Sequence, residues 1–448
     1  MKGARVRALL AALLLLTAAC KGPARSHAFP TTTTLPKPVR IGVWTPPDPT
    51  AQTYGGAAVR ELIYPQLFRA TPAGQWQASL VVAGSDKTDP GNTSARFRLR
   101  PNAKWSDGTP ISAADLRRTL DPRFVTAVDD ATADGTIVVH FTQALPGWRR
   151  LWSGLGAITP PRDGVFGGPF KIGSITSGLE TILLANDAYF GARPQIREVH
   201  FVLVPDPEIA ARLMERGELD VIAPPAFTGR TIRLQRIKQA RVLVGDATRG
   251  GWSAALVANP SHLDLNQRLF LFSYANGPRF ADVLLHDEAT ATGQAVGVPA
   301  AKPAFPTAPA FTAPDESAPG STLVHAMQRA AHKAGFDFDD RQSEFDKVLA
   351  AYASGDFDVL FRLEPLDPTP CWTCRYANLD AANAKAADAG DTTAQTAIEH
   401  ELLSQAYELP LWRERPEAAV RDGLDGVTLD GFDVLGPAWN LPAWHWGR

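Results

Sequence analysis

The chain has 448 residues, of which 45% are hydrophobic and 21% are charged, so it can bury the cores of two or three domains. Lys and Arg number 45 against 47 Asp and Glu, which gives a net charge of −2. This balance argues against a polyanionic partner such as nucleic acid, because such partners are attracted by a basic surface.

The first twenty residues have the features of a secretion signal. A positively charged start is followed by an apolar run over 8–19, which is shorter than the roughly 20 residues that span a bilayer. Small residues then precede Cys20, an arrangement that resembles a bacterial lipobox. We therefore predict that 1–20 is a lipoprotein signal peptide and that Cys20 carries a lipid anchor. An ordinary secretory signal with an incidental Cys20 is the alternative.

Residues 21–38 are rich in proline and threonine and predict a flexible tether, because they cannot build a core. If Cys20 is lipidated, Cys371 and Cys374 remain as an even pair, which favours a disulfide outside the cytoplasm. A redox pair or half of a metal site is the alternative for this C-x-x-C.

Between residues 95 and 116 the sequence predicts a strand, a turn and a capped helix. Phe and Leu alternate with Arg over 95–100, and Asp-Gly at 107–108 predicts a turn. Ser112 and Asp115 have the spacing of a capping box. The same periodicities predict further strands over 39–44, 135–142 and 252–258, and a helix that includes 59–63.

Residues 166–223 predict a strand, a helix and another strand. Residues 199–204 alternate as a buried strand, Asp206 suits a helix N-cap and Gly217 a helix stop. Ile209 and Leu213 are spaced to face one core. The short connections predict a right-handed β-α-β crossover and hence a parallel sheet.

The second half repeats this alternation of helices and strands. Residues 300–319, rich in Ala and Pro, predict an extended surface loop. The periodicity then predicts helices over 321–334 and 343–353, a strand over 357–363, a late helix that includes 398–406, and a strand over 409–412.

The chain resembles the extracytoplasmic solute-binding proteins of the peptide/nickel ABC-importer class, family 5. The family pattern F-x-L-R-x-x-x-x-W-x-D-G-x-P-x-S-A-x-D is present at 97–115. Further family pieces are Gly-Gly-Pro-Phe at 167–170, which lacks the usual threonine, and Gly-Glu-Leu-Asp at 217–220. The family's pattern on the helix near 267–277 keeps little beyond Arg268, which marks a divergent member.

This resemblance implies an α/β periplasmic-binding-protein-like fold, with two α/β lobes, a hinge and an inserted α+β domain in lobe one. Hinge closure would bury a ligand between the lobes. Carried over to this chain, the division is lobe one over 39–53, 164–241 and 411–448, the inserted domain over 54–163, and lobe two over 242–410.

The resemblance also implies candidate site residues. In the peptide binders an acidic residue after the segment equivalent to 355–358 pairs with the ligand's α-amino group, and here Asp367 is the first candidate and Glu364 the second. The alternative is that Asp367 only caps a turn before proline. Four aromatic residues are expected either to form walls of the cleft or to pack in an ordinary core: Trp44, Tyr54, Trp252 and Trp372.

The predicted function is that of a lipid-anchored substrate-binding protein, outside the cytoplasm, that captures an oligopeptide and delivers it to the permease of an ABC importer. The scaffold motifs leave metal chelates and sugars open as other ligands. A regulatory or interaction lipoprotein of the cell envelope is the alternative. No catalytic or nucleotide-binding motif is present, so we expect no enzyme and no cofactor. A monomer is expected.

Overall fold

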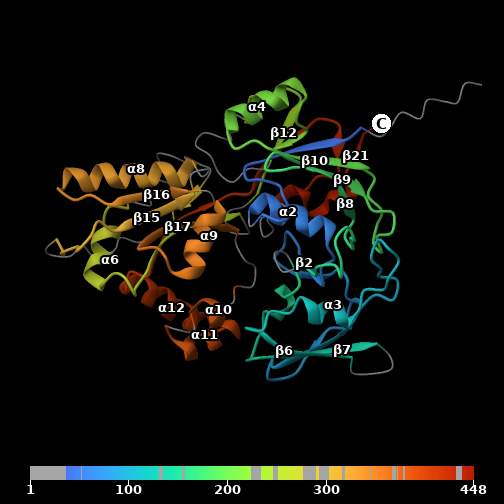
Figure 1. Cartoon of the computed structure of the whole chain (residues 1–448), viewed down its shortest axis with the longest axis horizontal. Helices are drawn as coiled ribbons and strands as arrows, with labels where there is room; N and C mark the ends of the chain where they lie inside the picture. The colour runs from blue at the N-terminus through green and yellow to red at the C-terminus, as the bar shows by residue number, and fades with distance from the viewer. Residues whose placement is uncertain are drawn as a thin grey trace, which may run out of the picture. The chain divides into compact units, whose positions relative to one another are not determined.

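We describe a computed structural model of the chain (Figure 1). All described residues belong to the compact unit Lys37–Arg448. The structure describes residues 37–51, 53–130, 135–153, 157–222, 234–245, 251–275, 289–291, 302–314, 318–343, 345–365, 370, 372–376, 379–429 and 436–447.

A mixed seven-stranded sheet forms the first α/β layer. Its strands are, in spatial order, β12 (Ala240–Val244), β19 (Glu417–Arg421), β11 (Val221–Ile222), β1 (Val39–Val43), β10 (Glu198–Leu203), β9 (Glu180–Ala185) and β8 (Phe170–Thr176). β1 is parallel to β10 and β11, whereas β9 and β19 run antiparallel to their neighbours. The buried side chains of β1 share one core with α2 (Tyr54–Ile63), which ends before Pro65.

The predicted strand-helix-strand unit is present as β10, α4 (Pro207–Arg216) and β11. The Asp206 carboxylate accepts a hydrogen bond from the Ile209 N–H at 2.8 Å, and Gly217 ends the helix with a left-handed φ of 81°. β10 and β11 flank β1 and are parallel to it, so the prediction of a parallel crossover is confirmed.

The predicted core face of α4 is wrong in part. Ile209 is 50% exposed, and the buried positions are Ala210, Ala211 and Met214. Ala210 and Ala211 are small, so the helix can approach the sheet closely on their side. The face that packs is therefore rotated by about one residue from the face that Ile209 and Leu213 define.

A four-stranded antiparallel sheet carries the most specific sequence pattern. Its order is β4 (Lys87–Thr88), β5 (Ser94–Arg98), β7 (Thr136–Phe141) and β6 (Val125–Asp130). The Ser112 N–H donates to the Asp115 carboxylate at 2.8 Å at the start of α3 (Ala113–Arg118), which confirms the capping box. The core is aromatic, with the Trp148 ring stacked on Phe97 at a centroid distance of 5.7 Å. The hairpin β2 (Phe68–Ala70) and β3 (Trp76–Ala78) and the short helix η1 (Trp148–Arg150) complete this part.

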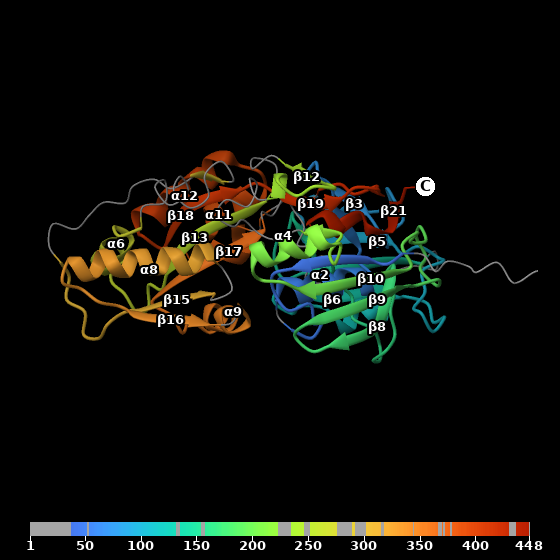
Figure 2. The same cartoon turned by 90° about the horizontal axis from the view of Figure 1, so that it is seen from above.

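A six-stranded sheet forms the second α/β layer, and its orange strands lie apart from the green strands β8, β9 and β10 in Figure 1. Its order is β14 (Ala289–Ala291), β18 (Glu408–Glu414), β13 (Trp252–Ala258), β17 (Val359–Pro365), β15 (Ala310–Pro314) and β16 (Asp339–Ser343). α8 (Ala318–Lys333) and α9 (Phe345–Ser354) contact β15 (Figure 2). The predicted helical face of α8 is buried: Leu323, Val324, Met327 and Ala331.

The prediction of a surface loop over residues 300–319 is wrong for its second half. Residues 310–314 form β15, every residue of which is buried, and α8 begins at Ala318. β15 pairs in parallel with both β16 and β17. A strand covered on both faces needs no alternation, and Pro314 is tolerated because it lies at the strand end.

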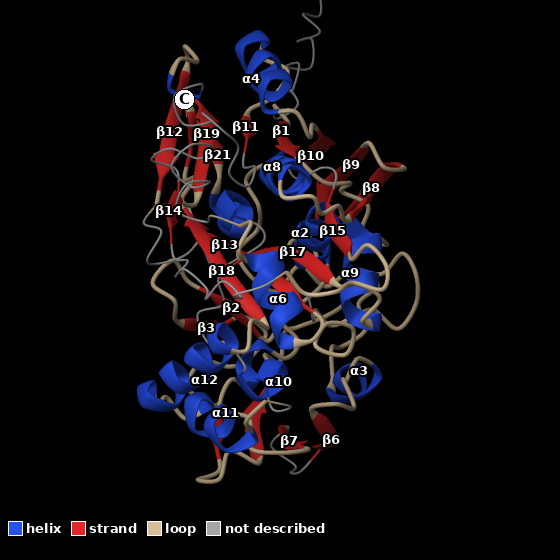
Figure 3. Cartoon of the chain, turned by 90° about the vertical axis from the view of Figure 1, so that its left-hand side faces the viewer, coloured by secondary structure: helices blue, strands red, loops and turns tan. Residues whose placement is uncertain are grey.

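Smaller elements complete the second layer and the C-terminal end. α6 (Leu265–Phe272) begins with a capping box, and α10 (Trp372–Tyr376), α11 (Ala381–Asp388) and α12 (Thr392–Ser404) form a helical group (Figure 3). The buried Arg268 of α6 donates to the carbonyls of Gln405 and Leu263, so it ties this helix to the end of α12. The chain then forms β20 (Leu424–Asp425), η5 (Gly436–Ala443) and β21 (His445–Trp446).

The domain boundaries stay a prediction. α2 shares a core with the seven-stranded sheet, although the proposed inserted domain starts at residue 54. β18, which includes Leu411, belongs to the six-stranded sheet, although the proposed lobe one resumes there. We therefore use the name lobe one for the seven-stranded sheet with its helices, and the name lobe two for the six-stranded sheet with its helices.

Candidate functional site

Two chain segments cross between the lobes and contact each other. One leads from β12 to β13, and the other from β18 to β19. The Gly245 N–H donates to the Pro416 carbonyl at 2.8 Å. Gly251 has a left-handed φ of 112°, and a Cβ atom there would lie 1.9 Å from the Glu414 carbonyl oxygen. The crossing is therefore a close backbone contact that only glycine permits at position 251.

Three aromatic side chains from both lobes meet beside this crossing. Trp44 follows β1, Tyr54 begins α2 and Trp252 begins β13. The Tyr54 and Trp252 rings lie edge to face with centroids 4.5 Å apart, and the Trp44 ring lies 5.5 Å from Tyr54 and 5.9 Å from Trp252. The edge-to-face geometry of the two pairs that involve Trp252 is a favourable arrangement for aromatic rings. We call these three residues the aromatic cluster.

The start of α2 is held in place by short-range hydrogen bonds. The Thr53 hydroxyl caps the helix by accepting from the Gly56 N–H at 3.0 Å, and the Thr45 hydroxyl accepts from the Gly55 N–H at 2.7 Å. A Cβ atom on Gly55 would lie 2.4 Å from the Thr45 carbonyl oxygen. The segment after β1 and the first turn of α2 are thus in close contact, which brings the ring of Tyr54 beside Trp44.

The hydroxyl of Tyr54 joins the two lobes, because it donates a hydrogen bond to the Leu363 carbonyl of β17. Burial raises the pKa of Tyr54 well above its ordinary value, and the nearby charge of Glu364 raises it further, against the smaller opposing effect of Arg362 and Arg375. The phenol is therefore a neutral donor at physiological pH.

A network of charged side chains borders Tyr54 on lobe two. It joins β17, β18 and α10, and we call it the charge network. Its ion pairs are Arg362 Nη2–Glu408 Oε1 at 2.5 Å, Arg362 Nε–Glu364 Oε1 at 3.4 Å and Arg375 Nη1–Glu364 Oε1 at 2.9 Å, and the Tyr376 hydroxyl donates to Glu408 Oε2 at 3.3 Å.

The charge network has equal numbers of arginines and glutamates, and both of its arginines are charged. Burial opposes the charge of Arg362, but the carboxylates of Glu408 and Glu364 outweigh it and hold the pKa of Arg362 well above its ordinary value. Burial likewise opposes the charge of Arg375, and Glu364 raises its pKa overall. Two guanidinium groups thus face two carboxylates, which is the arrangement that makes partly buried charges tolerable.

The predicted site residues are distributed in three ways. Trp44, Tyr54 and Trp252 lie together, and Glu364 lies close to them in the charge network. Trp372 packs instead in the helical group, with its ring centroid 5.7 Å from that of Tyr376. Asp367, Cys371 and Cys20 lie outside the described residues, as does the side chain of Cys374.

Sequence reasoning missed three members of the charge network: Arg362, Arg375 and Glu408. The strand segment Phe361-Arg362-Leu363-Glu364 carries a usable signal, because alternation places the two charged side chains on one face of an otherwise apolar strand. Arg375 and Glu408 come from other elements, so their pairing follows from the tertiary structure alone.

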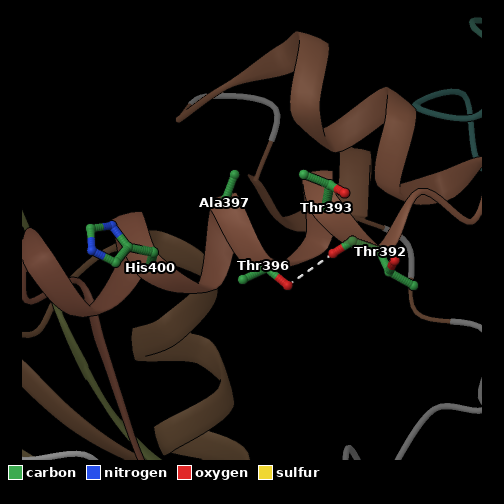
Figure 4. A pocket seen from close by; sticks show the side chains of 5 residues that line it. All are labelled: Thr392, Thr393, Thr396, Ala397 and His400. Carbon is green, nitrogen blue, oxygen red and sulfur yellow. Dashed lines mark hydrogen bonds between the residues drawn. The ribbon is translucent and has the colours of Figure 1, made fainter.

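A shallow pocket on α12 carries no site. It is lined by Thr392, Thr393, Thr396, Ala397 and His400 (Figure 4). All these side chains come from one helix, and a binding site normally draws on several converging elements. In the described part of the chain, no group of three or more His, Cys, Asp or Glu could hold a metal ion, and no helix is long and apolar enough to cross a membrane.

Comparison with known proteins finds one family that matches part of the chain. Residues 77–286 match the family of bacterial extracellular solute-binding proteins, family 5, in its middle region. The chain is 27% identical over 203 residues to the probable monoacyl phosphatidylinositol tetramannoside-binding protein LpqW of Mycobacterium tuberculosis, covering 37% of this chain and 31% of that protein. It is 26% identical over 204 residues to the oligopeptide-binding protein OppA of the same species, covering 38% and 32%. The match thus spans about a third of the length of these relatives.

Solved structures share the fold over nearly the whole chain. The oligopeptide-binding protein AppA from Bacillus subtilis, in complex with a nonapeptide, has a TM-score of 0.76 at 14% identity, with 92% of this chain and 99% of that chain covered. NikA from Staphylococcus aureus, in complex with Ni(L-His)2, has a TM-score of 0.71 at 14% identity, with 89% and 98% covered.

Over residues 77–286 the chain thus matches the family of bacterial extracellular solute-binding proteins, family 5, and its fold is that of solved solute-binding proteins. The predicted resemblance to this class and the predicted α/β fold are confirmed. The matched family, the OppA relative and the AppA structure are all named for binding.

Proposed function

We propose that this chain captures a small solute between its two lobes and delivers it to the permease of an ABC importer, and that this solute is an oligopeptide. The observation that carries the proposal is the aromatic cluster, which gathers residues of both lobes beside the crossing segments. Rigid aromatic faces bind apolar groups with little loss of conformational entropy. The relatives named for oligopeptide binding support the ligand class.

In this proposal Trp44, Tyr54 and Trp252 form the wall of the ligand site, with Trp372 farther out. Asp367 pairs with the ligand's α-amino group, and Glu364 is the second candidate for that role. Glu364 is already engaged by two guanidinium groups, which favours Asp367.

The protein acts outside the cytoplasm as a monomer, without a cofactor. A lipid on Cys20 and the tether over 21–38 hold it at the membrane, and Cys371 and Cys374 form a disulfide. Mass spectrometry of the membrane-extracted protein would detect the lipid as added mass on Cys20. An unmodified cysteine, or cleavage elsewhere, would contradict the anchor.

Ligand binding is tested by titrating the purified full chain with a peptide library, metal chelates and sugars while its melting temperature is followed. A ligand at a hundredfold excess over its dissociation constant stabilises the folded state by about 2.7 kcal/mol. We expect peptides to raise the melting temperature. If chelates or sugars do so and peptides do not, the ligand class is wrong.

Replacing Trp252 with leucine should weaken peptide binding by about 2 kcal/mol, or roughly thirtyfold, because the side chain contributes to the wall on lobe two. Isothermal titration calorimetry measures the change. Trp76→Leu is the matched control, since Trp76 is a partly buried tryptophan of β3 that packs in the core of the four-stranded sheet. Equal losses in both variants would remove Trp252 from the site.

A non-transport role as a regulatory or interaction lipoprotein is the second candidate. The aromatic cluster also supports this candidate, because its residues already contact each other without a ligand. Trp44 is only 4% exposed, and the Tyr54 hydroxyl is hydrogen-bonded to lobe two. A lobe contact that needs no ligand suits a protein that is permanently closed. Failure of every ligand class to shift the melting temperature would support this candidate.

Replacing Tyr54 with phenylalanine should cost about 1 kcal/mol of folding free energy below pH 9, because one hydrogen bond is lost. The pKa of Tyr54 is raised in the folded state, so its stabilising contribution is complete below the unfolded pKa of about 10 and is lost as pH rises toward the folded pKa. The stability difference between wild type and Tyr54→Phe should therefore shrink above about pH 10. Chemical denaturation across pH measures it, and a constant difference would contradict the assignment.

A further inference from the structure

Glu364 lies where the two lobes meet. The carbonyl of its neighbour Leu363 accepts the hydrogen bond from Tyr54, and Glu364 pairs in register with Ser253, the residue after Trp252. The Leu363 side chain is buried in the core of lobe two, so strand alternation turns Glu364 toward the opposite face. An unpaired carboxylate at this position would attract a cationic group of any ligand held by the aromatic cluster.

Arg375 forms a bidentate ion pair with the carboxylate of Glu364. Its Nη1 donates to Glu364 Oε1 at 2.9 Å and its Nη2 to Glu364 Oε2 at 3.3 Å, which is the fork geometry in which arginine recognises carboxylates. The two side chains are 35% and 24% exposed. The pair therefore lies at a surface that a bound molecule can reach.

The helix that carries Arg375 is anchored independently of this ion pair. The Asp388 carboxylate accepts hydrogen bonds from the Trp372 N–H at 2.7 Å, the Thr373 N–H at 3.1 Å and the Thr373 hydroxyl at 2.5 Å. The N-terminus of α10 is thus capped from α11. A change at Arg375 should leave α10 in place.

We propose that Arg375 sets the charge preference of the ligand site: by neutralising Glu364, it makes the subsite beside Tyr54 selective for an uncharged group of the ligand. This inference rests on the proposed function. The aromatic cluster supplies apolar contact area, and the paired carboxylate supplies no net charge, so an aliphatic or neutral polar side chain fits this subsite. Removing the guanidinium group converts it into a cation-preferring subsite. Arg375 is thus a specificity-determining residue.

The test uses two sets of alanine pentapeptides in which one position in turn is norleucine or lysine, which differ mainly in the terminal ammonium group. Calorimetry gives the affinity of each peptide for the wild-type chain and for Arg375→Met. We expect the wild type to bind the norleucine peptide more tightly than the lysine peptide when the varied position lies beside Tyr54. Arg375→Met should shift the ratio of these two affinities toward lysine by about tenfold, which is the effect of one ion pair at a partly exposed site.

Two control variants separate charge from shape. Arg375→Lys keeps the positive charge and should keep the norleucine preference, and Arg375→Met/Glu364→Gln removes both charges and should restore it. If Arg375→Met shows the wild-type ratio at every position, the inference is wrong while the proposed function stands.

The proposed ligand class and the inference can fail separately. If the wild type binds no pentapeptide, the proposal of an oligopeptide ligand fails, and saturation-transfer NMR with n-butylammonium and 1-butanol then tests the subsite directly. Stronger binding of n-butylammonium to Arg375→Met than to the wild type supports the role of Arg375. Equal binding overturns it.

Discussion

Replacing Gly251 with alanine is expected to lower the free energy of unfolding by about 3 kcal/mol or more. Two effects add: a left-handed conformation strains a residue with a Cβ by about 1–2 kcal/mol, and the Cβ must push aside the Glu414 backbone, whose oxygen would lie 1.9 Å away. Since β13 and β18 pair at this end, the strain should also loosen the crossing between the lobes. Chemical denaturation and hydrogen exchange of β13 measure the two consequences.

Gly84→Ala is the matched control for this prediction. Gly84 also has a positive φ, of 74°, but no atom lies within 4 Å of the position that its Cβ would take. It should lose only the conformational strain, about 1 kcal/mol. A similar loss in both variants would show that the crossing can relax around an added methyl group.

Replacing Arg362 with methionine is expected to cost about 3 kcal/mol, because Glu408 then loses its ion pair in a partly buried place and Glu364 keeps only Arg375. Arg362 and Glu408 are each 13% exposed, and breaking a buried ion pair from one side leaves the other charge uncompensated. Urea denaturation measures the loss. The melting temperature should fall by several degrees, as expected for a chain of this size.

Two further variants make the Arg362 result interpretable. Arg123→Met removes an arginine that is 78% exposed and paired with Asp121, and it should cost well under about 1 kcal/mol. Arg362→Met/Glu408→Leu removes both partners and should recover much of the stability, since apolar side chains of similar volume replace the pair. If the double variant is no more stable than Arg362→Met, the loss arises from packing and not from charge.

The local structure of this chain could be predicted well from its sequence because short-range patterns determine it. The capping box at Ser112 and Asp115, the Asp206 cap and the Gly217 stop depend on residues a few positions apart, and all three are present. The alternation in residues 95–100 and the helical spacing from Leu323 to Ala331 likewise encode which side chains are buried.

The predictions fail where a residue is buried by elements that lie far away in the sequence. Residues 310–314 have a loop-like composition, yet the two parallel neighbours of β15 supply its hydrogen bonds, and α8 and α9 pack against it. The helical spacing predicts Ile209 inside, but two alanines beside it allow a closer approach of α4 to the sheet. In both cases the local pattern is ambiguous, and the choice is made by elements far away in the chain.

By itself, the sequence indicated the class that this protein resembles, the order of its main elements and four aromatic candidates for the proposed ligand site. Only the tertiary structure decided which candidates meet: three gather beside the crossing, while Trp372 packs among helices. It also decided that Glu364 is paired, because its partner Arg375 comes from another element and Arg362 is held in turn by Glu408. The physical reason is that the net charge of a site is a sum over side chains brought together by folding, whereas caps and periodicity are properties of neighbours in the chain.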